Sequence, residues 1–146
     1  MIRFFCPGIP KSMSVGKSFS FRRKGGPVQH VQKRNNTEWG LLVGQVGRQY
    51  APAVPLDGAL IVTAEFWLPR PMSLPKREAF TALPTRRPDL DNLFHKLMDS
   101  WNGVFWHDDS QVTDIVLRKR YPRDGRTGVE IIVASALSVF FHDKEA

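Results

Sequence analysis

The residues with the clearest chemical potential are four aspartates in the second half of the chain. Asp89 and Asp91 stand two positions apart, and Asp108 and Asp109 are adjacent. Neighbouring carboxylates repel one another, and burying them without a cation is costly. A shared hard cation removes that conflict, because Mg²⁺ prefers oxygen ligands and takes carboxylates together with water and phosphate. In a basic chain, these acids predict a metal site that cuts phosphodiesters.

Each acidic pair also has an ordinary structural explanation. Asp is a favoured N-cap, and negative charge is favourable at a helix N-terminus, so Asp89 or Asp91 is also suited to begin a helix. Two carboxylates at i and i+2 point to one side only in extended backbone, so shared ligation requires a helix that begins at or after Asp91. Asp108 and Asp109 fit a polar turn. The concentration of acids in a basic chain favours the metal site.

The charge of the whole chain favours a polyanionic partner. Lys and Arg number 21 against 14 Asp and Glu, which gives a formal net charge of +7. Neutralising phosphates releases condensed counterions, so such a surplus suits nucleic acid. An acidic membrane is the rival partner, but no basic amphipathic helix supports it. The candidate DNA contacts are Lys11, Lys17, Arg22, Arg23, Lys24, Arg86, Arg87, Lys119 and Arg120.

Length and cysteine content narrow the class of protein. A chain of 146 residues fits one domain, spanning residues 1–146. Cys6 is the only cysteine, which excludes an intrachain disulfide and a Cys-rich zinc site. No stretch has the length of a membrane span or of a signal peptide's apolar region. We therefore expect a soluble, cytoplasmic protein with no membrane contact and no small-molecule cofactor.

Periodicity and turn residues predict the elements that must position the acids. Apolar and β-branched runs predict strands at residues 2–6, 59–68, 111–121 and 129–138. Helical spacing predicts helices over about residues 35–50 and 91–102. Gly, Pro, Ser and basic residues predict loops at 11–34 and 69–88, the second with room for one helical turn. The order β-α-β-α-β-β predicts an α+β domain with two main helices on a mixed sheet.

The tryptophans have two possible roles. They are Trp39, Trp67, Trp101 and Trp106, and most lie inside apolar patterns. Stacking on nucleic-acid bases needs an exposed ring, whereas an apolar pattern places the ring in the core. We therefore expect the tryptophans to pack in the core.

The acidic segments belong to a longer pattern. It comprises Pro88-Asp89-Leu90-Asp91-Asn92-Leu93, Asp99, Asn102-Gly103-Val104, Trp106-His107-Asp108-Asp109-Ser110-Gln111-Val112 and the Lys-Arg-Tyr of 119–121. This pattern resembles the RusA family of Holliday junction resolvases, in which a D-x-D-N helix start precedes a D-D-[SA]-Q-[VI] segment. The resemblance covers about residues 87–135. The combined motif is specific, whereas either half alone is weak.

The resemblance implies a small α+β enzyme, an intertwined homodimer, that nicks four-way DNA junctions symmetrically with Mg²⁺, for which Mn²⁺ substitutes. Its metal-binding acids fall on Asp89, Asp91 and Asp109, while Asp108 matches an acid of less defined role. Polar positions that support the ligand geometry fall on Asn92 and Gln111. Such an enzyme acts in DNA recombination and repair and is encoded by a bacterium or a phage.

One position departs from the family pattern. The family commonly carries a Lys six residues after its first Asp, where this chain has His95 and, one place later, Lys96. On a helix, His95 lies one turn beyond Asp91. Lys96 sits about 100° further round, on a long and flexible stem. Either residue is a candidate to act at the scissile phosphate.

Two alternative functions stay open at this point. One is a metal-dependent nuclease that acts on other branched DNA, such as flaps. The other is a non-catalytic nucleic-acid-binding protein whose aspartates serve as caps and turns, and the exchange at His95 favours it. Substrate preference distinguishes the first alternative, and metal binding distinguishes the second.

Overall fold

The computed structural model describes residues 1–12, 18–22, 24–32, 38–79 and 81–142. A four-stranded sheet has the order β1-β6-β4-β5. β6 is antiparallel to both of its neighbours, whereas β4 and β5 are parallel, so the sheet is mixed as expected. The strands are β1 (Ile2–Pro7), β4 (Leu60–Trp67), β5 (Val112–Arg120) and β6 (Gly128–Ser135).

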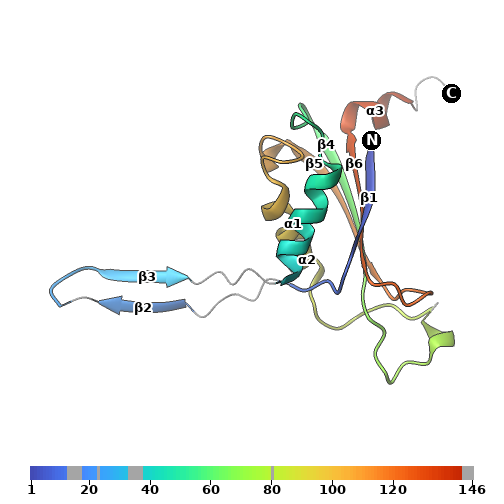
Figure 1. Ribbon diagram of the computed structural model, residues 1–146, viewed down its shortest axis with the longest axis horizontal. Helices are drawn as coiled ribbons and strands as arrows, with labels where there is room; N and C mark the ends of the chain where they lie inside the picture. The colour runs from blue at the N-terminus through green and yellow to red at the C-terminus, as the bar shows by residue number, and fades with distance from the viewer. Residues whose placement is uncertain (13–17, 23, 33–37, 80, 143–146) are drawn as a thin grey trace.

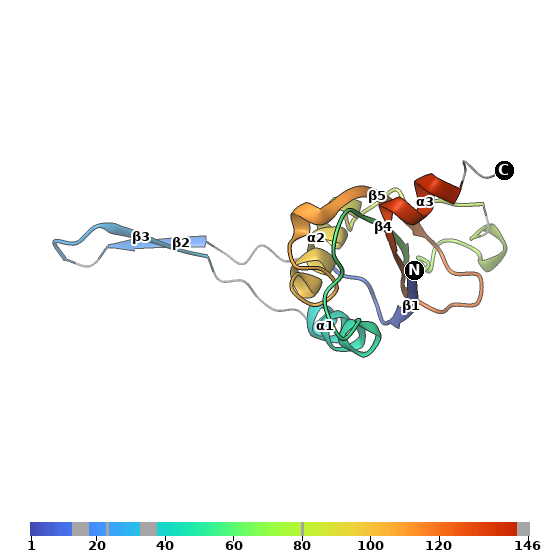
Figure 2. The same ribbon diagram turned by 90° about the horizontal axis from the view of Figure 1, so that it is seen from above.

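Two helices, α1 (Glu38–Tyr50) and α2 (Leu90–Trp101), cover one face of this sheet (Figures 1 and 2). In α2, Leu93, Leu97 and Trp101 repeat at helical spacing and are fully buried. Even-numbered side chains of β4 and odd-numbered side chains of β6 join them in the core, because strand side chains alternate between faces. The expected α+β class with two main helices is confirmed.

The connection between β4 and β5 sets the place of the acids. Parallel strands need a crossover, and α2 lies in it. The helix therefore runs back along the sheet, against the direction of both strands. Its first residues lie at the carboxyl end of β5, and its last residues lie at the amino end of that strand.

The expectation of a loop at residues 11–34 is wrong for the middle of that segment. β2 (Ser18–Arg22) and β3 (Val28–Gln32) form an antiparallel hairpin. Ser and Phe alternate along β2, a period-2 signal that the basic composition of the segment obscured. Gly25 takes a positive φ of 80° in the turn, a conformation that glycine adopts without steric cost. The hairpin stands away from the four-stranded sheet (Figures 1 and 2).

The last expected strand is too long, because β6 ends at Ser135 and the chain continues as α3 (Ala136–His142). The Ala136 backbone N–H donates to the carbonyl of Ala59, and the Ser138 hydroxyl donates to the carbonyl of Ser135 at 2.7 Å.

In the 69–88 segment, one short 3₁₀ turn, η1 (Lys76–Glu78), interrupts the loop. No helix in the described residues is both long and apolar enough to cross a membrane.

Candidate active site

The first acidic pair lies at the N-terminus of α2. Asp89 is the N-cap residue, yet its carboxylate makes no capping hydrogen bond. Asp91 lies in the first turn, and both side chains are exposed. Shared ligation by an extended Asp89 and Asp91 pair required a helix that begins at or after Asp91. The helix instead begins at Leu90, one residue earlier. Asp89 and Asp91 therefore flank the first helical residue, and shared ligation of a cation by their carboxylates stays a prediction.

Lys119 of β5 holds the backbone that leads into this helix. Its Nζ donates to the carbonyl oxygens of Arg86 at 2.9 Å and Pro88 at 3.1 Å. Those carbonyls belong to the stretch directly before Asp89, in which the Arg87–Pro88 peptide bond is cis. The position of Asp89 is thus tied to the sheet through one lysine, a role that sequence reasoning missed. A DNA contact by Lys119 stays a prediction.

The two candidates further along α2 have different environments. His95 is exposed, one turn beyond Asp91 on the same side of the helix. Lys96 is only 5% exposed, and its stem packs so closely over Gly40 of α1 that a side chain at Gly40 would collide with it. Of the two, His95 is therefore the one placed beside the exposed acids.

The second acidic pair opens a 3₁₀ turn, η2 (Asp109–Gln111). Asp108 caps it, because its Oδ1 accepts a hydrogen bond from the Ser110 backbone N–H at 2.9 Å. In return, Gln111 Oε1 accepts from the Asp108 backbone N–H at 3.0 Å, which completes a capping box. The Ser110 N–H stabilises the charged carboxylate and lowers the pKa of Asp108 below its ordinary value. Capping therefore accounts for Asp108, and metal binding by it stays a prediction.

The carboxylate of Asp109 is oriented by a residue of the hydrophobic core, not by a cap. Its Oδ1 accepts a 2.7 Å hydrogen bond from Nε1 of Trp106, whose ring is fully buried. None of the described residues donates a hydrogen bond to the other oxygen, Oδ2. A carboxylate oriented by a rigid donor, with one oxygen left over, is suited to bind a hard cation. The expected burial of Trp106 is confirmed. Sequence reasoning missed its hydrogen bond to Asp109. The three-residue spacing between Trp106 and Asp109 was the signal available for it.

Gln111 joins η2 to the loop before β4. Its Nε2 donates to the carbonyls of Leu56 at 2.8 Å and Gly58 at 3.1 Å, and its Oε1 also accepts from the His107 backbone N–H at 2.7 Å. His107 Nε2 in turn lies 3.1 Å from Asp57 Oδ1 in the same loop. These bonds hold the backbone on both sides of Asp108, and support of the metal-ligand geometry by Gln111 stays a prediction.

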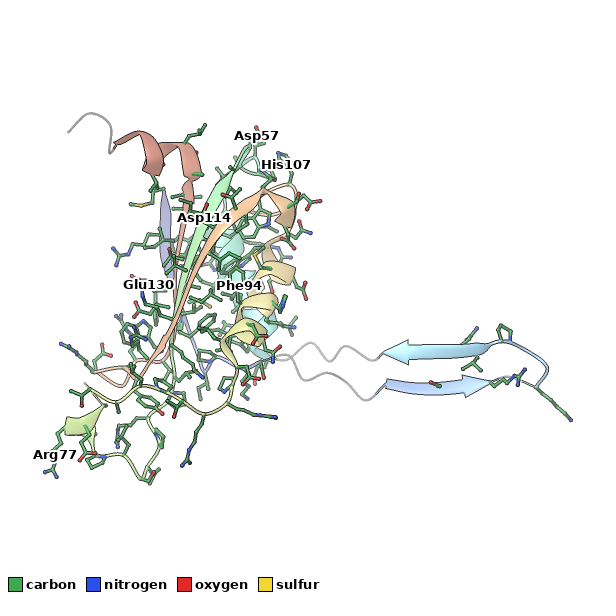
Figure 3. The ribbon with its side chains drawn as sticks, turned by 180° about the vertical axis from the view of Figure 1, so that it is seen from behind. Asp57, Arg77, Phe94, His107, Asp114 and Glu130 are labelled. Carbon is green, nitrogen blue, oxygen red and sulfur yellow. The ribbon has the colours of Figure 1, made fainter. Side chains whose placement is uncertain are left out.

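The two acidic pairs lie at opposite ends of the body. α2 has 12 residues, or about 18 Å at 1.5 Å per residue. Asp89 stands at its start, and Asp109 follows its end. In Figure 3, His107 and Asp57 lie at one end of the body, and Phe94, from the first half of α2, lies further along. Among the residues that the structure describes, no three His, Cys, Asp or Glu side chains gather in a metal-binding arrangement.

The predicted DNA-binding residues are spread over several elements. Arg86 and Arg87 are exposed directly before the acidic helix start. Arg120 is less exposed: it donates to the Lys119 carbonyl at 2.9 Å, and its Nε lies 3.9 Å from Glu65. In and near the hairpin, Lys11, Arg22 and Lys24 are exposed, while Lys17 and Arg23 lie outside the described residues.

An α+β domain that exposes carboxylates at a helix start, in a chain of net charge +7, is compatible with a nuclease. The sequence model of the family described as "Endodeoxyribonuclease RusA" matches residues 10–132. The chain therefore belongs to the RusA endodeoxyribonuclease family, as its motif predicted, and the family implies nuclease activity of the Holliday junction resolvase type. The chain is also similar to the "Uncharacterized protein YqaN" of Bacillus subtilis (strain 168), with 31% identity over an alignment of 101 positions that covers 64% of this chain and 71% of that protein.

Proposed function

We propose that this protein is a Mg²⁺-dependent endonuclease that resolves four-way DNA junctions by two symmetric nicks, in DNA recombination and repair. The observation that supports this most is the start of α2. Two exposed carboxylates stand there, directly after Arg86 and Arg87, and the N-cap residue Asp89 makes no capping bond. Carboxylate oxygens fit a hard cation, and arginines suit phosphate, so the residues match the family's chemistry. Mn²⁺ is expected to replace Mg²⁺.

The chain's own residues have separate tasks in this mechanism. Asp89 and Asp91 would hold the ion, which supplies activation of water and neutralisation of charge at the leaving oxygen. His95, on the same side of α2, would stabilise negative charge on the phosphate. Lys119 keeps the backbone before Asp89 in position. Preorganised groups of this kind act without reorganisation during the reaction.

We also propose that two copies pair through β5. This strand lies at the edge of the sheet, and its residues Ile115 and Val116 are 46% and 38% exposed. An edge strand with exposed apolar side chains is a template for pairing with another chain. Antiparallel pairing about Val116, the middle of the strand, creates a twofold axis there. The homodimer that the family resemblance implies then has a defined contact.

This pairing would complete the metal site. The Val112 end of one β5 would lie beside the Arg120 end of the other. Asp109 precedes Val112, whereas Asp89 lies near the other end, where Lys119 holds Pro88. Asp109 of each copy would thus approach Asp89 and Asp91 of the other. Two identical sites result, as a pair of symmetric nicks requires.

The segment 11–34, which we call the basic arm, would supply the charge that binds DNA. It holds seven Lys and Arg and no Asp or Glu, and the rest of the chain has equal numbers of basic and acidic residues. Its hairpin stands clear of the body (Figure 1). A two-stranded ribbon fits the major groove of DNA, which is about 12 Å wide. Contacts from the arm to phosphates would recognise shape more than sequence.

A cleavage assay tests the proposed function. The protein is incubated with Mg²⁺ and a labelled four-way junction, flap, fork or linear duplex, with EDTA as the control. We expect paired nicks in the junction and none in EDTA. Preference for flaps or forks would indicate a nuclease for other branched DNA, and cleavage in EDTA or preference for duplex would contradict the proposal. Junction binding with no cleavage in either metal would indicate the non-catalytic alternative.

A further inference from the structure

A pocket of about 300 Å³ lies where β1, β4 and the β5–β6 turn meet. Phe5 and Trp67 line it. Their chain neighbours Phe4, Cys6 and Phe66 are in the core under the helices, so the alternation of strand side chains turns Phe5 and Trp67 to the opposite face. α1 and α2 leave that face uncovered (Figure 2). Both aromatic rings thus lie on the face of the sheet opposite the helices, and the expectation that Trp67 packs in the core is wrong.

Gly128 makes room for the Phe5 ring, which forms one wall of this pocket. It lies in β6 between Pro7 of β1 and Trp67 of β4. Its φ of 154° favours glycine, and a side chain there would collide with the Phe5 ring and the Cys6 carbonyl. The missing side chain lets the Phe5 ring lie over β6, beside the strand that carries Trp67.

Arginines balance the acids at the rim. The Arg126 guanidinium lies 4.8 Å from the centre of the Phe5 ring, and its Nε is 3.8 Å from Asp124 Oδ2. Glu130 accepts hydrogen bonds from Arg3 at 2.9 and 2.7 Å. Because each carboxylate has an arginine partner, the rim does not repel an anion. The pocket therefore combines flat apolar walls, cationic groups and hydrogen-bond acceptors.

We propose that this pocket binds one unpaired nucleotide of the DNA substrate, with its base against Trp67 and Phe5 and its phosphate at Arg126. The inference rests on the proposed function. Aromatic rings stack with any base, and a guanidinium over an aromatic ring suits both the base and the phosphate. The pocket volume lies at the lower end of the range for small-molecule sites. A pocket of this size suits one nucleotide better than contact with another protein.

The pocket also lies close to the acidic helix start along the chain. Lys119 holds the backbone before Asp89, and Pro122, which lines the pocket, follows three residues later. Three residues span at most about 11 Å. A strand that passes around this end of the sheet would thus place a nucleotide in the pocket a few positions from the phosphate at Asp89. Extruding a base costs least where it is already unpaired, as at a branch point.

Junctions that carry 2-aminopurine at successive positions around the branch point test this assignment. The protein is bound in EDTA, so the DNA stays intact, and 2-aminopurine fluorescence is the readout. We expect one position to respond in the wild type and in Trp67→Phe, which keeps a stacking ring, but not in Trp67→Ala. The affinity of Trp67→Ala for the junction should fall between about fivefold and a hundredfold. Arg126→Ala should also weaken binding, whereas Arg48→Ala, an exposed arginine on α1, should not.

Each failure has a distinct meaning. A wild type that binds and cuts junctions with no responsive position would overturn the pocket assignment and leave the nuclease intact. The same holds if Trp67→Ala binds junctions as tightly as the wild type. It also holds if light scattering shows a changed oligomeric state for Trp67→Ala, because the pocket would then be a contact between subunits. A wild type that does not bind junctions would remove both proposals. If Trp67→Ala does not fold, the comparison of Arg126→Ala with Arg48→Ala decides.

Discussion

The indole Nε1 of Trp106 donates a 2.7 Å hydrogen bond to Oδ1 of Asp109. The indole ring is fully buried, so its orientation is fixed by the core. Asp109 is partly exposed, yet its carboxylate takes its direction from that buried donor. A residue that the sequence assigns to packing thereby positions a candidate metal ligand at the surface.

Replacing Trp106 by Phe keeps an aromatic ring but removes this hydrogen bond. We expect the Mg²⁺ concentration for half-maximal cleavage to rise between about tenfold and a hundredfold, as is typical when a ligand loses its orienting partner. Titration of the cleavage rate with Mg²⁺ measures the change. Trp101→Phe is the matched control, because Trp101 is also fully buried and donates its Nε1–H to the Val43 carbonyl at 3.2 Å. An equal shift in both variants would indicate a general loss of packing.

Asp91→Asn should bind junction DNA as tightly as the wild type and cut it at least about a hundredfold more slowly. Amide nitrogen and oxygen replace two anionic oxygens of similar shape, so the fold persists while affinity for a hard cation falls. Gel-shift binding and single-turnover cleavage give the two quantities. Glu78→Gln, which neutralises an exposed acid on η1, should leave both unchanged. A normal cleavage rate for Asp91→Asn in Mg²⁺ would show that the site lies elsewhere.

Mixing two inactive variants tests whether the site is shared between subunits. In a mixed dimer of Asp91→Asn and Asp109→Asn, the proposed pairing leaves one site with both mutations and the other with none. Random exchange makes about half of the dimers mixed, so about a quarter of the wild-type nicking activity should return. Those dimers should cut one strand only. If every site lies within one chain, the mixture stays inactive.

The capping bond of Asp108 should make part of the stability depend on pH. Its pKa is lowered from an ordinary 3.8 by the Ser110 backbone N–H, so the folded state favours the charged form. The resulting stabilisation is present above the unfolded value and is lost as the pH falls through the lower folded value. Asp108→Asn should therefore unfold at lower urea than the wild type at pH 7, and the difference should shrink below about pH 3.8. A difference independent of pH would contradict the capping role.

The basic arm should set the salt dependence of DNA binding. Each phosphate contact contributes a slope of about −0.9 to the logarithm of affinity against the logarithm of salt concentration. Replacing Arg22 and Lys24 by Ala should therefore reduce the slope by up to about 2. Arg48→Ala combined with Arg77→Ala removes the same charge from exposed residues elsewhere and is the control. Equal slopes for the two double variants would mean that the arm has no special part.

Much of the body was predictable because its signals are local. Leu93, Leu97 and Trp101 repeat at helical spacing, and they predicted α2 to within one residue at each end. The hairpin was missed because its alternation is short and lies in a basic segment. α3 was missed because Ala136 to Ser138 continues the apolar run of β6.

The contacts that support the candidate site were not predictable, because they join distant parts of the chain. Lys119 reaches the Pro88 carbonyl across 31 positions, and Gln111 reaches the Leu56 carbonyl across 55. Nothing in the local sequence around Lys119 distinguishes a backbone clamp from a DNA contact. Sequence motifs therefore indicated which acids are candidate metal ligands, while the fold alone gives the partners that orient them.

The surplus of positive charge is concentrated in one segment of the sequence, the basic arm. The whole net charge of the chain, +7, is matched by the surplus of that segment, and the hairpin of that segment stands clear of the rest (Figure 1). In the electric field of a polyanion such as DNA, a protein with this charge distribution would rotate before contact, so that its positively charged segment faces the polyanion. Orientation during approach speeds productive encounter more than it strengthens the final complex. The basic arm would thus orient the rest of the protein, which has no net charge, toward the DNA before the two make contact.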